Sequence, residues 1–439
     1  MHPKVLLDAC ADLVRLALQF DHPADAVVSR FFRDHRGLGP RERATLAETV
    51  YTVLRKKLLF EHFAPSGSGP RERRLAILGL ADYLEQDAGR RAGDTARSHR
   101  DFLQAALNEQ ESAWLAQCRA IRHADLLERH RHNLPEWLVA PLKAQLGAEF
   151  WPLVDSLERG AGLDLRVNTQ KAKRSDVQKA LAAAGIRSSA TPYSPWGLRV
   201  EGKPPINKLE AFLRGEVEVQ DEGSQLLAML VDAKRGEMVV DFCAGAGGKT
   251  LALGASMRST GRLYAFDTSA HRLDALKPRL ARSGLSNVHP AAIAHERDER
   301  VKRLAGKIDR VLVDAPCSGL GTLRRNPDLK WRQSPEDVAE LTQRQASILQ
   351  GAARLVKPGG RLVYATCSVL PQENEAIAEA FGAAHPDFVL QAVGPLLAGL
   401  KVDQAASLCS GGEDGQAYLR LWPHRHATDG FFAAVWQRK

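Results

Sequence analysis

The sequence lacks three features that would place the protein in familiar classes. None of its apolar runs approaches the roughly twenty residues that a membrane-spanning helix needs. Its N-terminus has no basic region followed by an apolar run and a small-residue cleavage site. Its six cysteines form no C-x-x-C pair and have no zinc-like spacing to histidine, so we expect neither disulfides nor a structural metal. These absences favour a cytoplasmic protein with free thiols.

The chain is long and carries excess positive charge. Its 439 residues exceed one ordinary hydrophobic core and suggest about three domains. Lysine and arginine number 61 against 52 acidic residues, which gives a net charge of +9. This charge favours a polyanionic partner but does not establish one, because many basic proteins bind no nucleic acid specifically.

The sequence pattern changes twice along the chain. Residues 1–132 place apolar side chains at helical spacing, which predicts an all-α domain. Residues 133–215 combine linker helices with short strands in turn-rich sequence, which predicts a small α+β insert. From residue 216 to residue 439, apolar strands alternate with amphipathic helices, a pattern typical of a parallel sheet with helices on both faces.

Basic residues are dense in the first of these regions. Such a cluster is what a phosphate-contacting face would require, although an ordinary solvated helix face is an equally good interpretation. The residues concerned are Arg30, Arg33, Arg36, Arg41, Arg43, Arg55, Lys56 and Lys57.

Chemically distinctive residues follow four apolar strands of the last region. In an open α/β sheet, ligands bind beyond the carboxyl ends of the strands. We therefore expect one site, formed by the residues that come directly after these strands. They are the glycine loop after residues 238–242, then Asp267, Asp314, Cys317 and Cys367.

The glycine loop is D-F-C-A-G-A-G-G-K-T, residues 241–250. A phosphate-binding Walker A loop would need glycine at the position of Cys243, and the dinucleotide spacing G-x-G-x-x-G is also absent. Asp267 follows the next strand, twenty positions after Gly247, where a carboxylate suits ribose hydroxyls. An adenosine-type cofactor without a required pyrophosphate fits best, and a tight turn that serves only packing is the alternative.

Two cysteines add a possible chemistry to this site. Cys367 follows an apolar strand, and Cys317 follows another in D-A-P-C-S-G-L-G. Either thiol alone could be a small buried side chain of the core. Two thiols over an adenosine-cofactor pocket, without metal ligands, suggest covalent chemistry on an electrophilic carbon.

Three motifs together carry a resemblance to a known family. C-A-G-A-G-G-K-T, D-A-P-C-S-G-L-G and Y-A-T-C-S resemble the Sun-type RNA cytosine carbon-5 methyltransferases, in particular the bacterial ribosomal RNA branch called RsmB or Fmu. E-V-Q-D-E-G-S-Q (218–225), L-R-V-N-T (165–169) and T-D-G-F-F (428–432) extend the resemblance. The helical region is similar to the NusB-like RNA-binding domain of the same branch.

The resemblance implies an S-adenosylmethionine-dependent, Rossmann-like methyltransferase domain at 216–439, after an RNA-binding insert. It implies that Cys367 attacks carbon 6 of a cytosine, and that Cys317 assists loss of the carbon-5 proton or release of the thiolate. Asp314 would hydrogen-bond the base or the cofactor, and Asp267 would hold the ribose. The methionine end would be wrapped by Cys243, Ala244, Gly245, Ala246, Gly247, Gly248 and Lys249, the last of which would also orient catalytic groups.

Two departures from the family pattern bear on the site. The usual loop C-A-A-P-G-G-K has Gly245 and Ala246 here in place of Ala-Pro, which trades a stiff turn for a looser one. The acid that contacts adenine after the third strand has no clean match, and Glu296 and Asp298 are both candidates.

A basic loop follows the Cys317 motif. R-R-N-P-D-L-K-W-R, residues 324–332, could grip single-stranded RNA beside the site, or could cap the sheet edge with Trp331 in the core.

The expected partner is RNA, because attack on carbon 6 requires an unstacked base in a loop or single-stranded region, and ribosomal RNA is the expected kind. We expect a monomer that needs neither metal nor membrane. The alternatives are a ribosome-assembly factor that only binds RNA, and a methyltransferase acting on cytosine in tRNA or DNA.

Overall fold

The computed structural model describes residues 1–90 and 95–439. Contacts within the chain divide it into two compact units. The first combines Met1–Gly160 with Leu323–Ser334, and the second combines Ala161–Thr322 with Pro335–Lys439. The division into domains at residues 132 and 215 stays a prediction.

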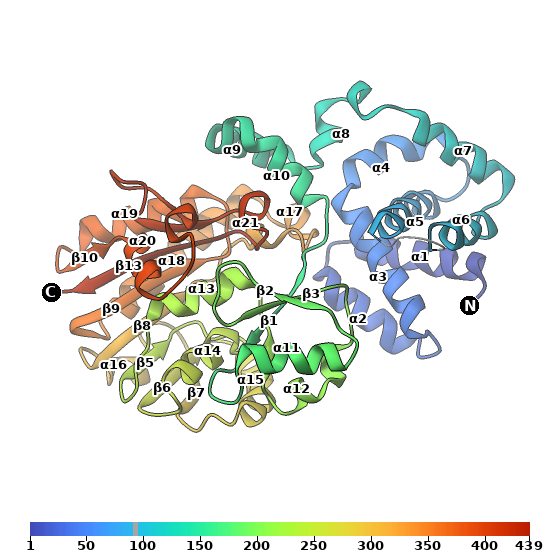
Figure 1. Ribbon diagram of the computed structural model, residues 1–439. Helices are drawn as coiled ribbons and strands as arrows, with labels where there is room; N and C mark the ends of the chain where they lie inside the picture. Colours follow the sequence, from blue (N-terminus) through green and yellow to red (C-terminus); the bar gives the residue numbers. More distant parts are fainter. Residues whose placement is uncertain (91–94) are drawn as a thin grey trace. The chain divides into compact units, whose positions relative to one another are not determined.

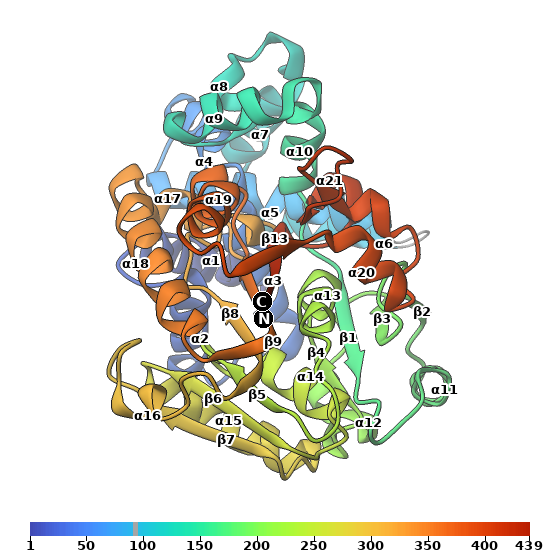
Figure 2. The same ribbon diagram turned by 90° about the vertical axis from the view of Figure 1, so that its left-hand side faces the viewer.

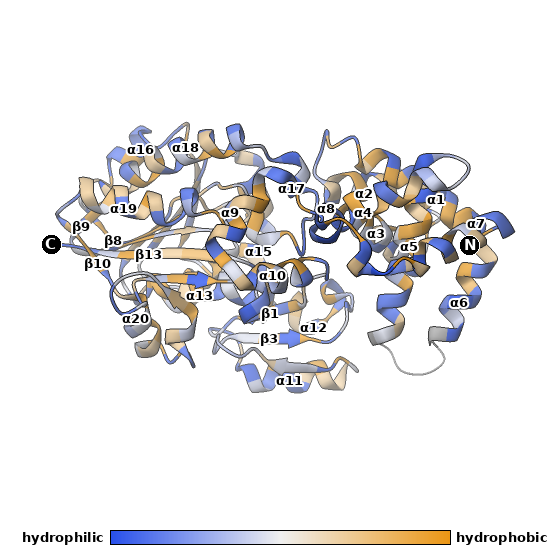
Figure 3. Ribbon diagram, turned by 90° about the horizontal axis from the view of Figure 1, so that it is seen from above, coloured by the Kyte–Doolittle hydropathy of each residue, from blue (hydrophilic) through white to orange (hydrophobic). Residues whose placement is uncertain are grey.

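The first unit is helical (Figure 1). Helices α1, α3 and α5 alternate hydrophobic and hydrophilic residues along their length, as amphipathic helices do (Figure 3), and they pack on one another around buried leucines such as Leu7, Leu46 and Leu75. Asn108 and Glu111 form a capping box at the start of α7, with each side chain accepting the other's backbone N–H. The helices are α1 (Pro3–Ala17), α2 (Ala24–Asp34), α3 (Pro40–Arg55), α4 (Lys57–Phe63), α5 (Arg71–Arg90), α6 (Thr95–Ala106), α7 (Glu109–Ala120), α8 (Glu128–His132), α9 (Glu136–Leu146) and α10 (Phe150–Leu157).

The segment Leu323–Ser334, with the short helix α17 (Leu329–Arg332), belongs to this helical unit. The indole N–H of Trp331 donates to the backbone oxygen of Leu54 at 2.7 Å, and the ring packs against the helical core. The Lys330 ammonium donates to the backbone oxygen of Arg55 at 2.8 Å. The interpretation of this loop as a cap over the sheet edge is therefore wrong, because Trp331 packs on the helical core and Lys330 bonds α3. Contact of the loop with RNA stays a prediction.

Residues 163–219 form a small antiparallel sheet in the second unit, in the order β2-β3-β1-β4. Leu165, Val167 and Leu198 make its core with Val177 and Leu181. The elements are β1 (Leu163–Val167), α11 (Arg174–Ala183), β2 (Ser188–Ala190), β3 (Gly197–Val200), α12 (Glu210–Leu213) and β4 (Val217–Val219).

A larger mixed sheet organises the rest of the second unit, in the order β11-β12-β13-β9-β8-β5-β6-β7, with β10 paired to β13. Strands β9, β8, β5, β6 and β7 run parallel, as predicted, but β13 pairs antiparallel with β9 and β12. A fully parallel sheet was the wrong expectation, because β12 and β13 are joined by a connection too short for a parallel crossover. The strands are β5 (Met238–Asp241), β6 (Arg262–Asp267), β7 (Val288–Ala292), β8 (Ile308–Asp314), β9 (Val356–Thr366), β10 (Phe388–Gln391), β11 (Cys409–Ser410), β12 (Tyr418–Leu421) and β13 (Phe431–Arg438).

Helices cover both faces of this sheet. Alternate residues of each strand point to opposite faces, so Val363 packs in one core cluster and Tyr364 in the other. In Figure 2, α16 and α18 lie to the left of the strands, whereas α13 and α20 lie to their right. The helices are α13 (Glu222–Val231), α14 (Gly248–Ser256), α15 (Ala270–Ser283), α16 (Glu299–Lys302), α18 (Pro335–Ala353), α19 (Glu375–Ala384), α20 (Val393–Gly399) and α21 (Pro423–His426).

Burial of Lys330 predicts a specific pH dependence of stability. Burial lowers the pKa of Lys330 to about 7, against about 10.4 in an unfolded chain. The energetic cost of burying this lysine is therefore full below pH 7 and declines as the pH rises, because the folded side chain releases its proton first. We expect the stability advantage of Lys330→Met over the wild type to shrink by about 2 kcal/mol between pH 7 and pH 9. Urea denaturation of both proteins at several pH values measures it, and a constant difference would contradict the account.

Candidate active site

The parallel strands of the large sheet end side by side. Asp314 of β8 is level with Ala365 of β9, and Asp241 of β5 is level with both Leu312 of β8 and Ala265 of β6. The residues that follow these strands consequently share one edge of the sheet. The structure brings the glycine loop, Asp267, Asp314, Cys317 and Cys367 together there, as the strand pattern predicts.

The glycine loop is shaped by two positive backbone angles. Gly247 has φ of +83°, and a Cβ there would lie 2.1 Å from Cδ1 of Leu276, so only glycine fits. Gly245 has φ of +54°, and a Cβ on it would meet no atom within 4 Å. A side chain at this φ would be strained, so the backbone conformation favours the glycine found here. The open space at Gly245 leaves the loop backbone accessible to a ligand.

Asp267 fixes the glycine loop to the end of β6. Its Oδ2 accepts the backbone N–H of Gly245 at 2.8 Å, and its Oδ1 accepts that of Ser269 at 2.7 Å. Each carboxylate oxygen can accept a second hydrogen bond, so these contacts orient the group without exhausting it. A carboxylate held in this way fits the predicted contact with ribose hydroxyls.

Lys249 and Asp314 form an ion pair at the centre of the site, with Nζ and Oδ2 separated by 2.7 Å. Burial alone would lower the pKa of Lys249, but the Asp314 carboxylate outweighs burial and raises it. Lys249 therefore stays charged. Nearby, burial raises the pKa of Asp241 to about 7, although Asp241 accepts a hydrogen bond from the Thr250 hydroxyl.

The two predicted catalytic cysteines touch. The sulfur atoms of Cys317 and Cys367 are 3.4 Å apart, within hydrogen-bond distance for thiols. The Cys367 sulfur, together with burial, raises the pKa of the Cys317 thiol well above its usual range. The thiol of Cys317 is therefore held in its protonated form.

Cys243 has a different environment. Burial, and then the carboxylates of Asp241, Asp314 and Asp267, raise the pKa of its thiol. Its side chain packs beside one core cluster of the sheet. Cys243 therefore lacks the properties of a nucleophile, in keeping with its predicted place in the cofactor loop.

The two candidate adenine-binding acids have different surroundings. Asp298 caps α16, accepts the backbone N–H of Ala294 at 3.0 Å, and lines a hollow just beyond β7, the strand that neighbours β6. Glu296 instead accepts the Ser347 hydroxyl of α18 at 2.6 Å. Of the two candidates, Asp298 is thus the one that lines the hollow.

Two arginines that sequence reasoning missed hold the glycine loop from outside. Arg166 of β1 donates to the backbone oxygen of Gly248 at 2.8 Å, and burial lowers the pKa of Arg166 to about 10. Arg279 of α15 donates to the backbone oxygen of Ala246 at 2.6 Å and pairs with Glu218 of β4. The sequence feature that could have indicated a role for Arg166 is its charge within the short strand of L-R-V-N-T.

Sequence reasoning also gave no role to Glu373, which lies between β9 and α19. This fully buried carboxylate accepts hydrogen bonds from Ser318 and Ser368, the residues that follow the two cysteines. Its signal was a polar run, P-Q-E-N-E, directly after the T-C-S motif.

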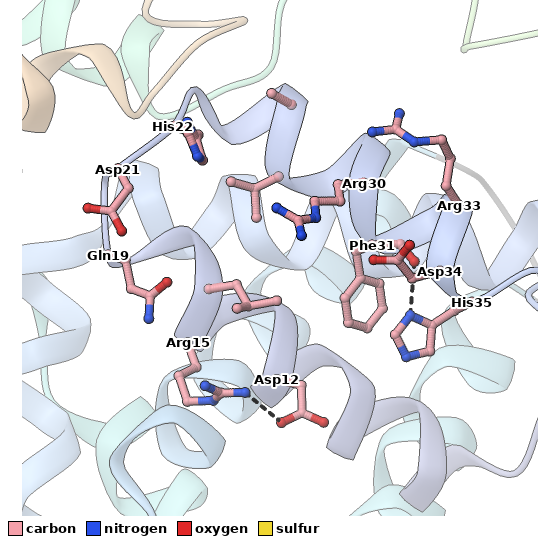
Figure 4. A pocket seen from close by; sticks show the side chains of 13 residues that line it. Asp12, Arg15, Gln19, Asp21, His22, Arg30, Phe31, Arg33, Asp34 and His35 are labelled. Carbon is pink, nitrogen blue, oxygen red and sulfur yellow. Dashed lines mark hydrogen bonds and ion pairs between the residues drawn. The ribbon is translucent and has the colours of Figure 1, made fainter.

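The basic cluster of the helical unit is divided by the structure. Arg30 and Arg33 are exposed and line a groove of about 670 Å³ between α1 and α2, together with acidic side chains such as Asp12 (Figure 4). Lys56 pairs with Asp82 at 2.7 Å, and several others are also engaged within the unit. A single phosphate-contacting face over all eight residues is therefore wrong. The engaged residues are Arg43, Arg55, Lys56 and Lys57.

Two features are absent from the part of the chain that the structure describes. It contains no group of three or more histidine, cysteine or acidic side chains that could hold a metal ion. None of its helices is long and apolar enough to cross a membrane.

Comparison with known proteins identifies relatives along nearly the whole chain. A probable ribosomal RNA small subunit methyltransferase B from Synechocystis is 33% identical, covering 94% of this chain and 95% of the relative. A methyltransferase homologue from Pyrococcus horikoshii has a solved structure that is 28% identical, with a TM-score of 0.60 over 71% of this chain and 97% of its own. NSun6 from the same organism, solved with SFG, shares the fold at 20% identity and a TM-score of 0.60, over 70% of this chain and 99% of its own.

Two family profiles match the second half of the chain and the region before it. The profile of the 16S rRNA methyltransferases RsmB/F matches residues 228–437, and that of the ferredoxin-like domain of RsmF/B-like methyltransferases matches residues 134–207. The matched regions contain the glycine loop and both cysteines. The chain therefore belongs to the RsmB/F family of ribosomal RNA methyltransferases, as the motifs of its sequence predict.

Proposed function

We propose that this methyltransferase modifies carbon 5 of a cytosine in small-subunit ribosomal RNA, through a covalent bond between Cys367 and carbon 6 of the base. The observation that carries the proposal is the 3.4 Å contact between Cys317 and Cys367 at the ends of two adjacent parallel strands. Single-cysteine chemistry would not need a second thiol there. Two thiols allow one to bond the base while the other moves a proton.

Attack begins from the thiolate of Cys367. Cys317, whose pKa is raised, keeps its proton and hydrogen-bonds the Cys367 sulfur. As the sulfur adds to carbon 6, electrons of the carbon 5–carbon 6 double bond move to carbon 5. Carbon 5 then becomes nucleophilic enough to take a methyl group.

Release of the methylated base depends on the change of the Cys367 sulfur from a thiolate to a thioether. In the covalent adduct, Cys367 is a neutral thioether, so the interaction that most raises the pKa of Cys317 is lost. Cys317 then releases its proton to solvent, and its thiolate takes the carbon-5 proton as a base. The electrons of the carbon–hydrogen bond restore the double bond, and Cys367 leaves carbon 6 as a thiolate.

The proposed methyl donor is S-adenosylmethionine, and the residues present fit it. When bound, it supplies an electrophilic methyl group on a sulfonium. Asp267 would accept the ribose hydroxyls, the open backbone around Gly245 would accommodate the methionine end, and Asp298 rather than Glu296 would face the adenine. The glycine loop is held for this by Arg166 and Arg279.

The ion pair between Lys249 and Asp314 is the proposed holder of the base. Asp314 keeps partial exposure, with 29% of its side chain accessible, so an oxygen can still bond the cytosine ring. Lys249 fixes the orientation of that carboxylate and places a positive charge beside the thiols, because its charged state is maintained by Asp314.

The proposed substrate segment is an unstacked or single-stranded cytosine, since carbon 6 is inaccessible inside a base-paired stack. The helical unit, proposed to be NusB-like, would bind flanking RNA through exposed side chains such as Arg30 and Arg33. A monomer that works in the cytoplasm stays a prediction of this function.

Two alternative functions can be distinguished from the proposed one by experiment. An RNA-binding assembly factor without methylation would be favoured if the chain failed to bind S-adenosylmethionine in calorimetry. A tRNA or DNA cytosine methyltransferase would be favoured by activity on those nucleic acids and none on small-subunit RNA. The paired thiols disfavour a DNA enzyme whose nucleophile is the cysteine of a P-C motif.

The division of labour between the thiols predicts opposite behaviour of two variants. Cys367→Ala should abolish methyl transfer from labelled S-adenosylmethionine to ribosomal RNA, because no adduct can form. Cys317→Ala should accumulate a covalent RNA adduct that survives denaturing electrophoresis, because release lacks its base. Cys409→Ala, at a half-buried cysteine on β11, is the matched control and should behave as wild type. Accumulation of the adduct in Cys367→Ala instead would mean that the roles are reversed.

The contact between the sulfurs predicts a pH effect on Cys317. Its raised pKa is due first to Cys367, so Cys367→Ala should lower the pKa of Cys317 toward the ordinary thiol range. The rate of Cys317 alkylation by iodoacetamide, followed by mass spectrometry against pH, should reach its midpoint at a lower pH in the variant than in the wild type. A midpoint that is unchanged or higher in Cys367→Ala would show that Cys367 does not control the Cys317 proton.

A further inference from the structure

The residue that follows each catalytic cysteine is a serine, and the two serines meet. Ser318 comes after Cys317, and Ser368 comes after Cys367. Both are buried, with 1% and 0% of their surface exposed, and their hydroxyl oxygens are 3.3 Å apart. The two loops that carry the cysteines are therefore also linked by this pair of serines.

A single carboxylate binds both serines. Glu373 has no exposed surface, and its Oε1 accepts the backbone N–H of Ser318 at 2.8 Å and Nε2 of Gln345 at 3.0 Å. Its Oε2 accepts the hydroxyl of Ser318 at 2.5 Å and also the hydroxyl of Ser368. Two bonds on each oxygen use the full acceptor capacity of a carboxylate. They also compensate the burial of its charge.

The surrounding hydrogen bonds fix Glu373 itself. The Tyr364 hydroxyl of β9 donates to the backbone oxygen of Glu373 at 2.6 Å, and Gln345 of α18 also donates to the backbone oxygen of Pro316 at 3.0 Å. Next to Glu373, the Asn374 side chain donates to the backbone oxygen of Ser368 at 3.1 Å. The carboxylate is thus anchored to the strand before one cysteine and to the residue before the other.

We propose that Glu373 is a positioning residue that sets the distance between the two thiols, an inference that rests on the proposed function for its catalytic consequence. Each cysteine is one residue from a serine that Glu373 holds, so a shift of either serine moves the adjacent sulfur. A displacement of about 1 Å in a reacting group can cost on the order of 100-fold in rate. The carboxylate itself does not touch the base.

Glu373→Gln tests this role with little change in shape. The amide nitrogen cannot accept hydrogen bonds, so one pair of donors loses its acceptor while the side chain keeps its volume. Glu375→Gln is the matched control, because Glu375 is two residues away, 26% exposed in its side chain, and pairs with Arg420 rather than with either serine. Both variants remove one negative charge from the same segment.

The first measurement does not depend on methyl transfer. Diamide accepts two electrons and two protons from a pair of thiols, which then form a disulfide, at a rate that depends on how often the sulfurs meet in reactive geometry. Mass spectrometry should show the Cys317–Cys367 disulfide forming at least about tenfold more slowly in Glu373→Gln than in the wild type, and at the wild-type rate in Glu375→Gln. Equal rates in all three proteins would overturn the proposal.

The second measurement connects position to catalysis. We expect Glu373→Gln to lower kcat on the order of 100-fold with an unchanged KM for RNA, because the variant alters thiol geometry and leaves the RNA-binding surfaces intact. A raised KM with an unchanged kcat would overturn the catalytic part. If the disulfide result holds but the wild type transfers no methyl group to cytosine, the proposed function fails and the positioning role stands.

Single serine variants test the same link if Glu373→Gln does not fold. Ser318→Ala and Ser368→Ala each remove one hydroxyl from the network, and both should slow formation of the disulfide. Ser318→Ala should mainly increase the covalent RNA adduct, because it disturbs Cys317, whereas Ser368→Ala should mainly slow formation of that adduct. Wild-type disulfide rates in both folded serine variants would overturn the proposal.

Discussion

The parallel pairing of β8 with β9 is the constraint on which the site depends. Asp314 and Ala365 are opposite each other in this pairing, so the loops that begin after them start at the same level. Each loop then carries a cysteine a few residues on, and the two sulfurs come within 3.4 Å although fifty residues separate them in sequence. A shift of one residue in this register would reverse the direction of every side chain on the shifted strand. The chemistry therefore depends on the fit of Val311, Val313, Leu362 and Tyr364 into the core below.

Charged side chains at the ends of the neighbouring strands surround the two cysteines. Asp241, Asp267 and Asp314 end three neighbouring strands, and each has a different partner: Thr250, the glycine-loop backbone and Lys249. Burial, and then these carboxylates, raise the pKa of Cys243, while Lys249 beside Asp314 supplies positive charge next to Cys367. Residues at the same strand ends thus give Cys243 of the glycine loop a different electrostatic environment from Cys367, the nucleophile of the proposed mechanism.

Local sequence predicted the parts of this arrangement that depend on chain order. Strand ends, the glycine loop, Asp267 and the two cysteines are visible because each follows an apolar run, and parallel strands bring their ends together. The antiparallel β13 was not expected, because its direction depends on the short connection from β12. The location of Lys330 and Trp331 against α3 was also missed, since the backbone oxygens of Leu54 and Arg55 that receive them are about 275 residues away in the chain. Glu373 was missed for a similar reason, because its four donors are assembled only when both cysteine loops fold.

The most direct test of the central claim is to identify the sulfur that bonds the base. Small-subunit RNA that contains 5-fluorocytidine has no proton at carbon 5, so an adduct that has received a methyl group cannot be released by proton loss. Incubation with this RNA and S-adenosylmethionine, followed by digestion and mass spectrometry, should find the nucleotide on the peptide that contains Cys367. A nucleotide attached to Cys317, or a methylated product without any attached peptide, would contradict the account.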